Sequence, residues 1–218
     1  MDTDLAGINR AFGKQGDPPI TPTILTYMKP NIEDTIETVF GFFELHGNEE
    51  YIGEPVSQLE HATQAAQLAE RAGADEETIL AALFHDFGHL CTSATAARMD
   101  GYGIVSHEKV GADYLRQAGF SEKIARLVES HVQAKRYLTF KNPDYYENLS
   151  EASQSTLAFQ GGRMTAQEAA GFEADVWFPL YLQMRYWDEQ AKEMHVPVPD
   201  LGIYKAMAER HLVSNSEL

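Results

Sequence analysis

A histidine and an aspartate stand side by side in an otherwise apolar stretch of this chain. The stretch reads Ala-Ala-Leu-Phe-His-Asp-Phe-Gly-His, and the pair is His85 and Asp86. The spacing of apolar residues predicts one helix over residues 75–90, with the pair inside it. A buried carboxylate is costly unless it is paired or bound to a metal ion. The pair therefore predicts a metal site in the core of a helical protein.

Further histidines and an aspartate fall in other predicted helices, or at their ends. The predicted metal ligands are His61, His85, Asp86, His107, His131 and Asp188. Helical bundles build metal sites from side chains that project into the core from several helices. Imidazole suits iron, manganese and zinc, and Asp86 could bridge two ions, as dinuclear sites require. None of these six positions is a cysteine, which disfavours a structural zinc site.

Most of the chain after residue 30 has helical periodicity, which predicts an all-α bundle. The expected helices cover residues 31–47, 57–73, 75–90, 106–117, 122–133, 176–193 and 201–212, with a short one after Ser150. Ser57 with Glu60, and Thr165 with Glu168, match the capping box that begins a helix. Prolines in residues 1–30 predict an extended N-terminal lead that packs on the domain, and residues 31–218 form that domain.

Composition narrows the functions open to the chain. The formal net charge of −16 disfavours nucleic-acid binding, because phosphate backbones attract basic surfaces. The only cysteine, Cys91, excludes an internal disulfide. No stretch is apolar for long enough to cross a membrane, and no signal peptide is apparent. A cytoplasmic monomer without nucleic-acid or membrane partners is the resulting expectation.

The ordered series of histidines and aspartates resembles the HD-domain superfamily. Its spacing resembles one branch closely, the mixed-valent diiron oxygenases that split the carbon–phosphorus bond of 1-hydroxyphosphonates. The resemblance covers residues 32–190 and implies an HD-domain bundle, two iron ions as Fe(II)/Fe(III), and O2 as co-substrate. It also implies a gating role for Tyr51 and Glu54, since that family has a tyrosine that occupies one iron at rest, supported by a glutamate.

Four further positions match residues that hold the phosphonate in that family. They are His89, Lys135, Ser153 and Arg185. His89 follows His85 by one helical turn, and Lys135 follows His131 in the same way. Arg185 precedes Asp188 by three residues, so both share a helix face. Cations beside a metal site suit a dianionic oxyanion.

The resemblance implies that C–P cleavage releases phosphate and a carboxylic acid. The preferred substrate is the trimethylated 2-amino-1-hydroxyethylphosphonate, which gives glycine betaine; the alternative is the primary amine, which gives glycine. A quaternary ammonium prefers aromatic faces, and Phe12, Tyr27, Tyr145 and Tyr146 are candidates for such a cage. Two other functions stay open, a metal-dependent HD phosphohydrolase and a noncatalytic metal-binding module.

Overall fold

The computed structural model describes residues 31–51, 53–92, 97–99 and 103–217. This part of the chain is helical and contains no strand beyond two isolated bridges, Glu50 with Ser57 and Arg98 with Ile104. Its elements are α1 (Ile32–His46), α2 (Gln58–Arg71), α3 (Glu76–Phe84), the 3₁₀ turn η1 (Phe87–His89), α4 (His107–Gln117), α5 (Glu122–Lys141), α6 (Pro143–Glu147), α7 (Glu151–Phe159), α8 (Ala166–Glu173), α9 (Phe178–Gln190) and α10 (Gly202–Ser216). The all-α prediction is confirmed.

Both predicted capping boxes are present. Ser57 accepts a hydrogen bond from the backbone N–H of Glu60, whose carboxylate accepts one from the N–H of Ser57, and α2 begins there. Thr165 and Glu168 do the same for α8. Each box satisfies two of the backbone donors that a helix start leaves unpaired. The first box fixes the start of α2, and therefore the position of His61 one turn later.

The predicted helix over residues 75–90 is wrong in its second half. The helix α3 ends at Phe84, and His85 follows as its C-cap. Asp86 has φ −101° and ψ 12°, after which η1 begins. His85 and Asp86 therefore lie at a break between two helical segments and not inside one helix. The break turns their side chains toward a common centre, which a regular helix does not do for adjacent residues.

Other helix boundaries also differ from the prediction. The fifth helix was expected to end near residue 133, but α5 continues to Lys141. Residues 143–147 were expected as a loop and instead form α6, which has Pro143 in its first turn. Proline is well tolerated there because its missing N–H would have no partner. The longer α5 matters for the site, because it places Lys135 inside a helix and not at its end.

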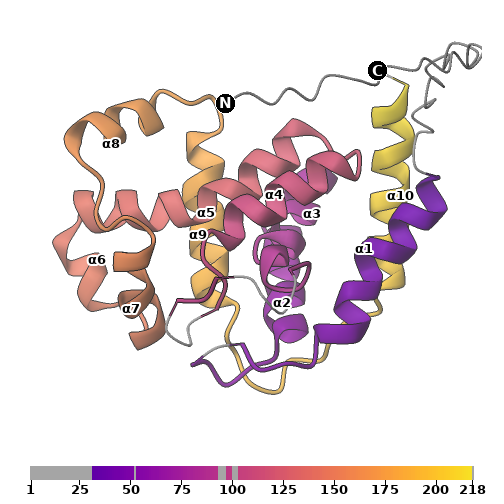
Figure 1. Cartoon of the computed structure of the whole chain (residues 1–218), viewed down its shortest axis with the longest axis horizontal. Helices are drawn as coiled ribbons and strands as arrows, with labels where there is room; N and C mark the ends of the chain where they lie inside the picture. The colour runs from indigo at the N-terminus through magenta and orange to yellow at the C-terminus, as the bar shows by residue number, and fades with distance from the viewer. Residues whose placement is uncertain (1–30, 52, 93–96, 100–102, 218) are drawn as a thin grey trace, which may run out of the picture.

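The helices α5 and α9 pack together at the centre of the molecule, as Figure 1 shows. The pair α2 and α3 packs on them from one side, and α4 packs along α5. The helices α1 and α10 lie against each other at one edge, and α6, α7 and α8 gather at the opposite edge (Figure 1). The six predicted ligands come from α2, the α3–η1 break, α4, α5 and α9, so the bundle brings them to one central place.

A cluster of phenylalanine rings packs beside that centre. Phe84 contacts Phe40, Phe43, Phe87 and Phe120, with ring centroids 5.5–6.1 Å apart. Edge-to-face aromatic contacts of this kind add to the free energy gained by burial. Because Phe84 and Phe87 flank His85 and Asp86, the cluster holds the break in place.

No helix of the described residues is long and apolar enough to span a bilayer. The predicted lead, residues 1–30 with Phe12 and Tyr27, lies outside the described part.

Candidate metal centre

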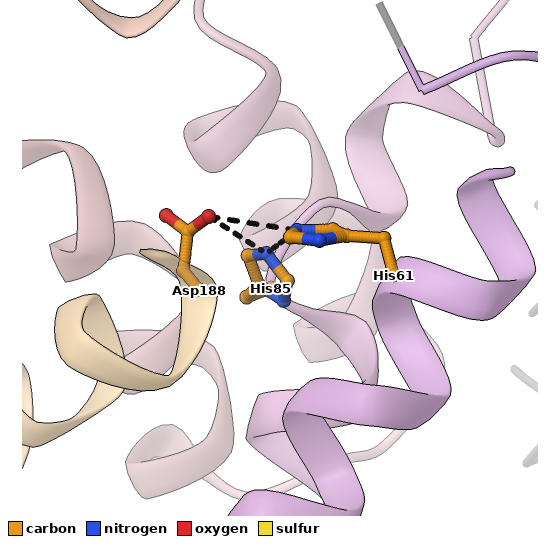
Figure 2. Close-up of side chains that lie close together, drawn as sticks. All are labelled: His61, His85 and Asp188. Carbon is orange, nitrogen blue, oxygen red and sulfur yellow. Dashed lines mark hydrogen bonds and ion pairs between the residues drawn. The ribbon is translucent and has the colours of Figure 1, made fainter. Parts of the chain in front are cut away.

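The structure brings the six predicted ligands together in two groups of three. His61, His85 and Asp188 form one group, and Asp86, His107 and His131 form the other. Within each group the potential ligand atoms lie within 4.8 Å of one another, and all six residues are buried. Figure 2 shows His61, His85 and Asp188 converging from α2, the end of α3 and α9. Sets of three protein ligands leave room for other ligands, which is typical of reactive metal sites.

Asp86 lies between the two groups. Its Oδ2 is 3.6 Å from His61 Nε2 and 3.4 Å from His85 Nε2. Its Oδ1 is 3.1 Å from His107 Nε2 and 3.3 Å from His131 Nε2. Each carboxylate oxygen thus faces one pair of histidines, which is the arrangement that a carboxylate bridging two metal ions requires.

The four histidines are held so that Nε2 faces the centre. Nδ1 lies 2.8 Å from a backbone carbonyl oxygen in His61 and His85, 3.3 Å in His107 and 2.7 Å in His131. A ring that donates Nδ1–H to a carbonyl has its Nε2 lone pair free for a metal ion. His61 Nε2 lies 2.9 Å from His85 Nε2, and His107 Nε2 lies 3.1 Å from His131 Nε2.

The lone pairs of two facing nitrogen atoms repel each other unless a proton or a metal ion lies between them. The pKa shifts of the neighbouring groups show that this centre favours positive charge. Burial opposes ionisation of Asp86, but the charge of His85 and hydrogen bonds from the histidines outweigh it and hold the pKa of Asp86 well below its usual range. Burial also lowers the pKa of His85, but Asp86 outweighs it and raises that pKa to about 9. Metal ions displace such protons when they bind, so the residues present fit two metal ions.

Arg185 orients Asp188 from the same helix. Arg185 Nη1 donates to Asp188 Oδ2 at 2.5 Å, and the other oxygen, Oδ1, lies 3.5 Å from His61 Nε2. Both side chains are buried. A buried carboxylate that keeps one oxygen for a cation and the other for an arginine has a fixed orientation. The predicted pairing of Arg185 and Asp188 on one helix face is confirmed.

A polar cavity opens beside the two groups. The volume of this cavity is about 60 Å³. Its described lining includes Asp86, Asp188 and all six of the further residues predicted from the resemblance: Tyr51, Glu54, His89, Lys135, Ser153 and Arg185. Such a small polar space suits a small ligand and not a nucleotide.

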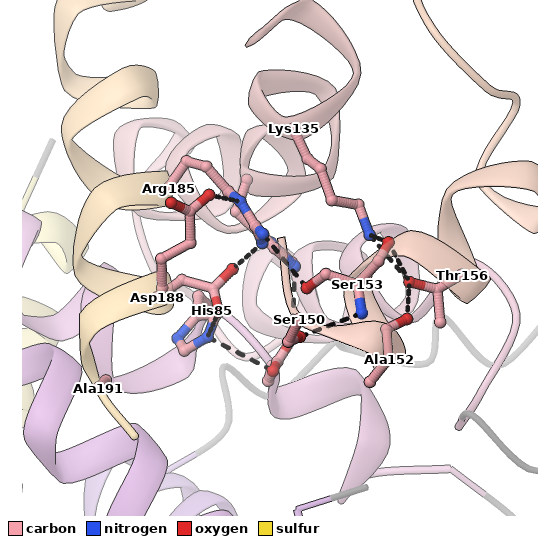
Figure 3. A network of polar contacts seen from close by, with 12 residues as sticks. His85, Lys135, Ser150, Ala152, Ser153, Thr156, Arg185, Asp188 and Ala191 are labelled. Carbon is pink, nitrogen blue, oxygen red and sulfur yellow. Dashed lines mark hydrogen bonds and ion pairs between the residues drawn. The ribbon is translucent and has the colours of Figure 1, made fainter. Parts of the chain in front are cut away.

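Lys135 and Arg185 approach Ser153 from two helices (Figure 3). Lys135 Nζ donates to the Ser153 carbonyl at 3.2 Å and to Thr156 Oγ1 at 2.9 Å. Arg185 Nη2 donates to Ser153 Oγ at 3.4 Å. Lys135 is 3% exposed, and no carboxylate of the described residues lies within ion-pair distance of it. A buried ammonium without a carboxylate favours an anion in the cavity.

Tyr51 covers the first group of ligands. Its ring stacks on the ring of His61, with centroids 3.8 Å apart and planes 14° apart. Burial, together with the carboxylates of Asp86 and Asp188, raises the pKa of Tyr51 well above its usual value. The carboxylate of Glu54 accepts a hydrogen bond from Lys192 at 2.5 Å.

His89 reaches the cavity from η1 and not from a continued helix. Its ring stacks on His107 with centroids 4.0 Å apart. The N–H of Ile104 donates to His89 Nδ1 at 3.2 Å. Burial, and then the charge of His107, lower the pKa of His89 well below its usual value. A neutral His89 with Nδ1 accepting has Nε2–H available as a donor.

Tyr145 and Tyr146, two of the candidates for an aromatic cage, are not among the described residues that line the cavity. The Tyr145 hydroxyl instead contacts Glu189 and accepts from Arg185 Nε at 3.0 Å. Sequence reasoning missed two residues, Glu189 and Lys192. Glu189 follows Arg185 by four residues within α9, and this helical spacing could have indicated it. Lys192 lies beyond the end of α9, where helical spacing does not apply.

The burial of Lys135 has a measurable effect on stability. Burial, and then the charge of Arg185, lower the pKa of Lys135 to about 7 in the folded protein. The cost of burying the charge is therefore full below pH 7 and disappears as pH approaches the ordinary lysine value. We expect Lys135→Met to stabilise the metal-free protein at pH 6 by about 1–3 kcal/mol, with a smaller gain at pH 10. Urea unfolding of both proteins at both pH values measures this, and an equal gain at pH 6 and pH 10 contradicts the assignment.

Comparisons with known proteins identify the family of the chain. Residues 58–159 match the HD domain. The [1-hydroxy-2-(trimethylamino)ethyl]phosphonate dioxygenase (glycine-betaine-forming) of Leisingera caerulea is 40% identical over 182 residues, 84% of this chain and 92% of that protein. The hydroxymethylphosphonate dioxygenase of Gimesia maris is 40% identical over 184 residues, 79% of this chain and 87% of that protein. An uncharacterized protein, L432, of Acanthamoeba polyphaga mimivirus is 40% identical over 182 residues, 83% of each. The chain therefore belongs to the family of HD-domain phosphonate oxygenases.

Proposed function

We propose that this protein uses O2 to cleave the carbon–phosphorus bond of a small 1-hydroxyphosphonate and releases phosphate. The observation that carries the proposal is Asp86, whose two oxygens face two separate histidine pairs beside a cavity with buried cations. Two relatives of named activity are phosphonate dioxygenases, which supports the same reaction class. The proposed cofactor is a pair of iron ions, as Fe(II) and Fe(III).

In this proposal the six residues hold the metal ions in two shells. His61, His85 and Asp188 would hold one ion, and Asp86, His107 and His131 would hold the other. When bound, the irons would activate O2 for reaction with the substrate, a task that protein side chains do not perform by themselves. The chain itself binds and orients the substrate. Its backbone carbonyls keep each Nε2 turned toward a metal ion, and Arg185 keeps Asp188 in position.

The phosphonate group is proposed to bind Lys135, Ser153 and Arg185. Arginine offers a planar fork of donors and lysine a compact charge, and both suit a dianionic oxyanion in a site of low dielectric. His89 is placed to donate a further hydrogen bond from Nε2. Tyr51 and Glu54 line the same cavity. They are proposed to gate the access of the substrate to the metal ions.

The proposed substrate is the trimethylated 2-amino-1-hydroxyethylphosphonate, and the product is glycine betaine. A quaternary ammonium prefers an aromatic face and a carboxylate. Tyr51 and Glu54 offer these two groups among the described lining residues. The primary amine, which gives glycine, and hydroxymethylphosphonate are the alternatives that the test compares.

The test is an assay of O2 uptake and phosphate release. Protein loaded with iron under reducing conditions is exposed to air with each of the three hydroxyphosphonates. We expect phosphate to appear in step with O2 uptake, and fastest with the trimethylated compound.

Each other outcome has a definite meaning. Phosphate release without O2 uptake means hydrolysis, as in other HD-domain enzymes. Neither signal, in protein shown to hold two irons, removes the phosphonate assignment. Electron paramagnetic resonance of the active protein tests the mixed-valent state, which has an unpaired electron shared by the two irons.

A further inference from the structure

Lys192 lies where three segments meet at the edge of the cavity. It follows α9, four residues after Asp188. Its Nζ donates to Glu54 Oε1 at 2.5 Å and to Ser150 Oγ at 3.5 Å, and lies 5.8 Å from the centroid of the Tyr51 ring. The side chains of Lys192 and Glu54 are 16% and 11% exposed. Ion pairs that are largely withdrawn from water are screened weakly, so this contact is stronger than an ordinary surface pair.

Glu54 belongs to a short loop, residues 51 and 53–57, which we call the Tyr51 loop. Hydrogen bonds from the N–H of Tyr51 to the Val56 carbonyl and from the N–H of Glu54 to the Tyr51 carbonyl, each 2.9 Å, close the loop on itself. Gly53 has φ +74°, and a side chain there would lie 3.3 Å from Ala152. The ion pair with Lys192 ties the loop to the segment that follows α9. Among the described residues, no other cation lies within ion-pair distance of Glu54.

Lys192 also lines the cavity, together with Lys135 and Arg185. Its ammonium can therefore pair with the Glu54 carboxylate or with an anionic oxygen in the cavity. A dianionic oxyanion carries more charge than a carboxylate and competes well for the same donor. When an oxyanion takes the ammonium, the loop loses the ion pair that holds it.

We propose that Lys192 is a positioning residue that holds the Tyr51 loop through Glu54 and releases the loop when a phosphonate enters the cavity. The inference rests on the proposed function only in taking a phosphonate as the oxyanion. It makes Lys192 the link between filling of the cavity and the position of Tyr51, which stacks on His61.

Hydrogen exchange of the loop amides tests the link. The protein is loaded with iron and kept under argon, and the probe is methylphosphonate, which has no C1 hydroxyl and so cannot react as a 1-hydroxyphosphonate. Without the probe, Lys192→Met is expected to speed exchange in a peptide spanning residues 47–58 by about tenfold, because loss of a partly buried pair favours local opening. Lys192→Arg is expected to restore slow exchange. The matched control is Lys205→Met, which removes a lysine paired with Glu44 on the surface.

The decisive comparison adds the probe. Methylphosphonate is expected to speed loop exchange in the unaltered protein and to leave the already fast exchange of Lys192→Met unchanged. The proposal is overturned if Lys192→Met exchanges as slowly as the unaltered protein, or if the probe acts equally on both. Faster exchange throughout α2 and α9 in Lys192→Met also overturns it, because that result means general destabilisation. If the exchange results are as expected but no hydroxyphosphonate is cleaved, the link stands and the proposed reaction falls.

Discussion

Replacing Asp86 with alanine is expected to remove both metal ions and to abolish activity. Each carboxylate oxygen of Asp86 faces a different histidine pair, so one substitution takes a ligand from both groups. It also leaves four buried histidines without the anion between them. We expect the activity to fall by about 10³-fold or more, because a metal-dependent reaction stops when its ions are lost.

Metal analysis of the purified Asp86→Ala protein measures the first effect. The companion variant is Asp188→Asn, which alters one group and leaves the other intact, and it is expected to keep the metal ion held by His107 and His131. Circular dichroism shows whether each variant is folded. Two tightly bound ions in a folded Asp86→Ala protein contradict the bridging role.

Replacing Gly88 with alanine is expected to disrupt the candidate metal centre, although Gly88 is not one of the six proposed ligands. A Cβ added to Gly88 would lie 1.9 Å from the carbonyl oxygen of His107, which is backbone and cannot turn away. The same two segments also meet at Gly111, where an added Cβ would lie 2.8 Å from the backbone nitrogen of Gly88. The start of α4 must therefore move away from η1, and His107 moves with it. We expect a loss of about 3 kcal/mol in the free energy of unfolding, a fall of about 6–12 °C in Tm, and weaker metal binding at Asp86, His107 and His131.

The matched control is Gly41→Ala. Gly41 is also in a helix, but an added Cβ meets nothing within 4 Å. Alanine is the better helix former there, so this variant is expected to be slightly more stable than the unaltered protein. Thermal unfolding and metal titration of both variants make the comparison. If Gly88→Ala melts at the same temperature as Gly41→Ala, then η1 and α4 are not held together as closely as the structure indicates.

The ligand types and the helical class could be predicted from the sequence because both depend on local pattern. Apolar periodicity indicated helices, and the capping boxes at Ser57 and Thr165 indicated two of their starts. A carboxylate in an apolar run needs a compensating charge wherever that run folds, so Asp86 indicated a metal site without any knowledge of the fold.

The sequence also placed Arg185 beside Asp188, since residues three apart share a helix face. The same reasoning could have added Glu189 but not Lys192, which lies beyond the end of α9. It failed for His85 and Asp86, because the chain leaves the helix after Phe84 although the apolar pattern continues. Gly88 is only a weak local signal of this break, because an isolated glycine is tolerated in a helix. The break places Gly88 closely against α4, which is a contact between segments distant in sequence.

What the sequence by itself determined is therefore the helical class and the identity of the buried polar residues, because periodicity and the cost of burying charge act within short segments. The tertiary structure alone decided how those residues are grouped. The division into two sets around Asp86, the pairing of Glu54 with Lys192, and the withdrawal of Tyr145 toward Arg185 all depend on which helices meet. These contacts between helices are set by packing and close backbone approach across the whole domain, and no single segment encodes them.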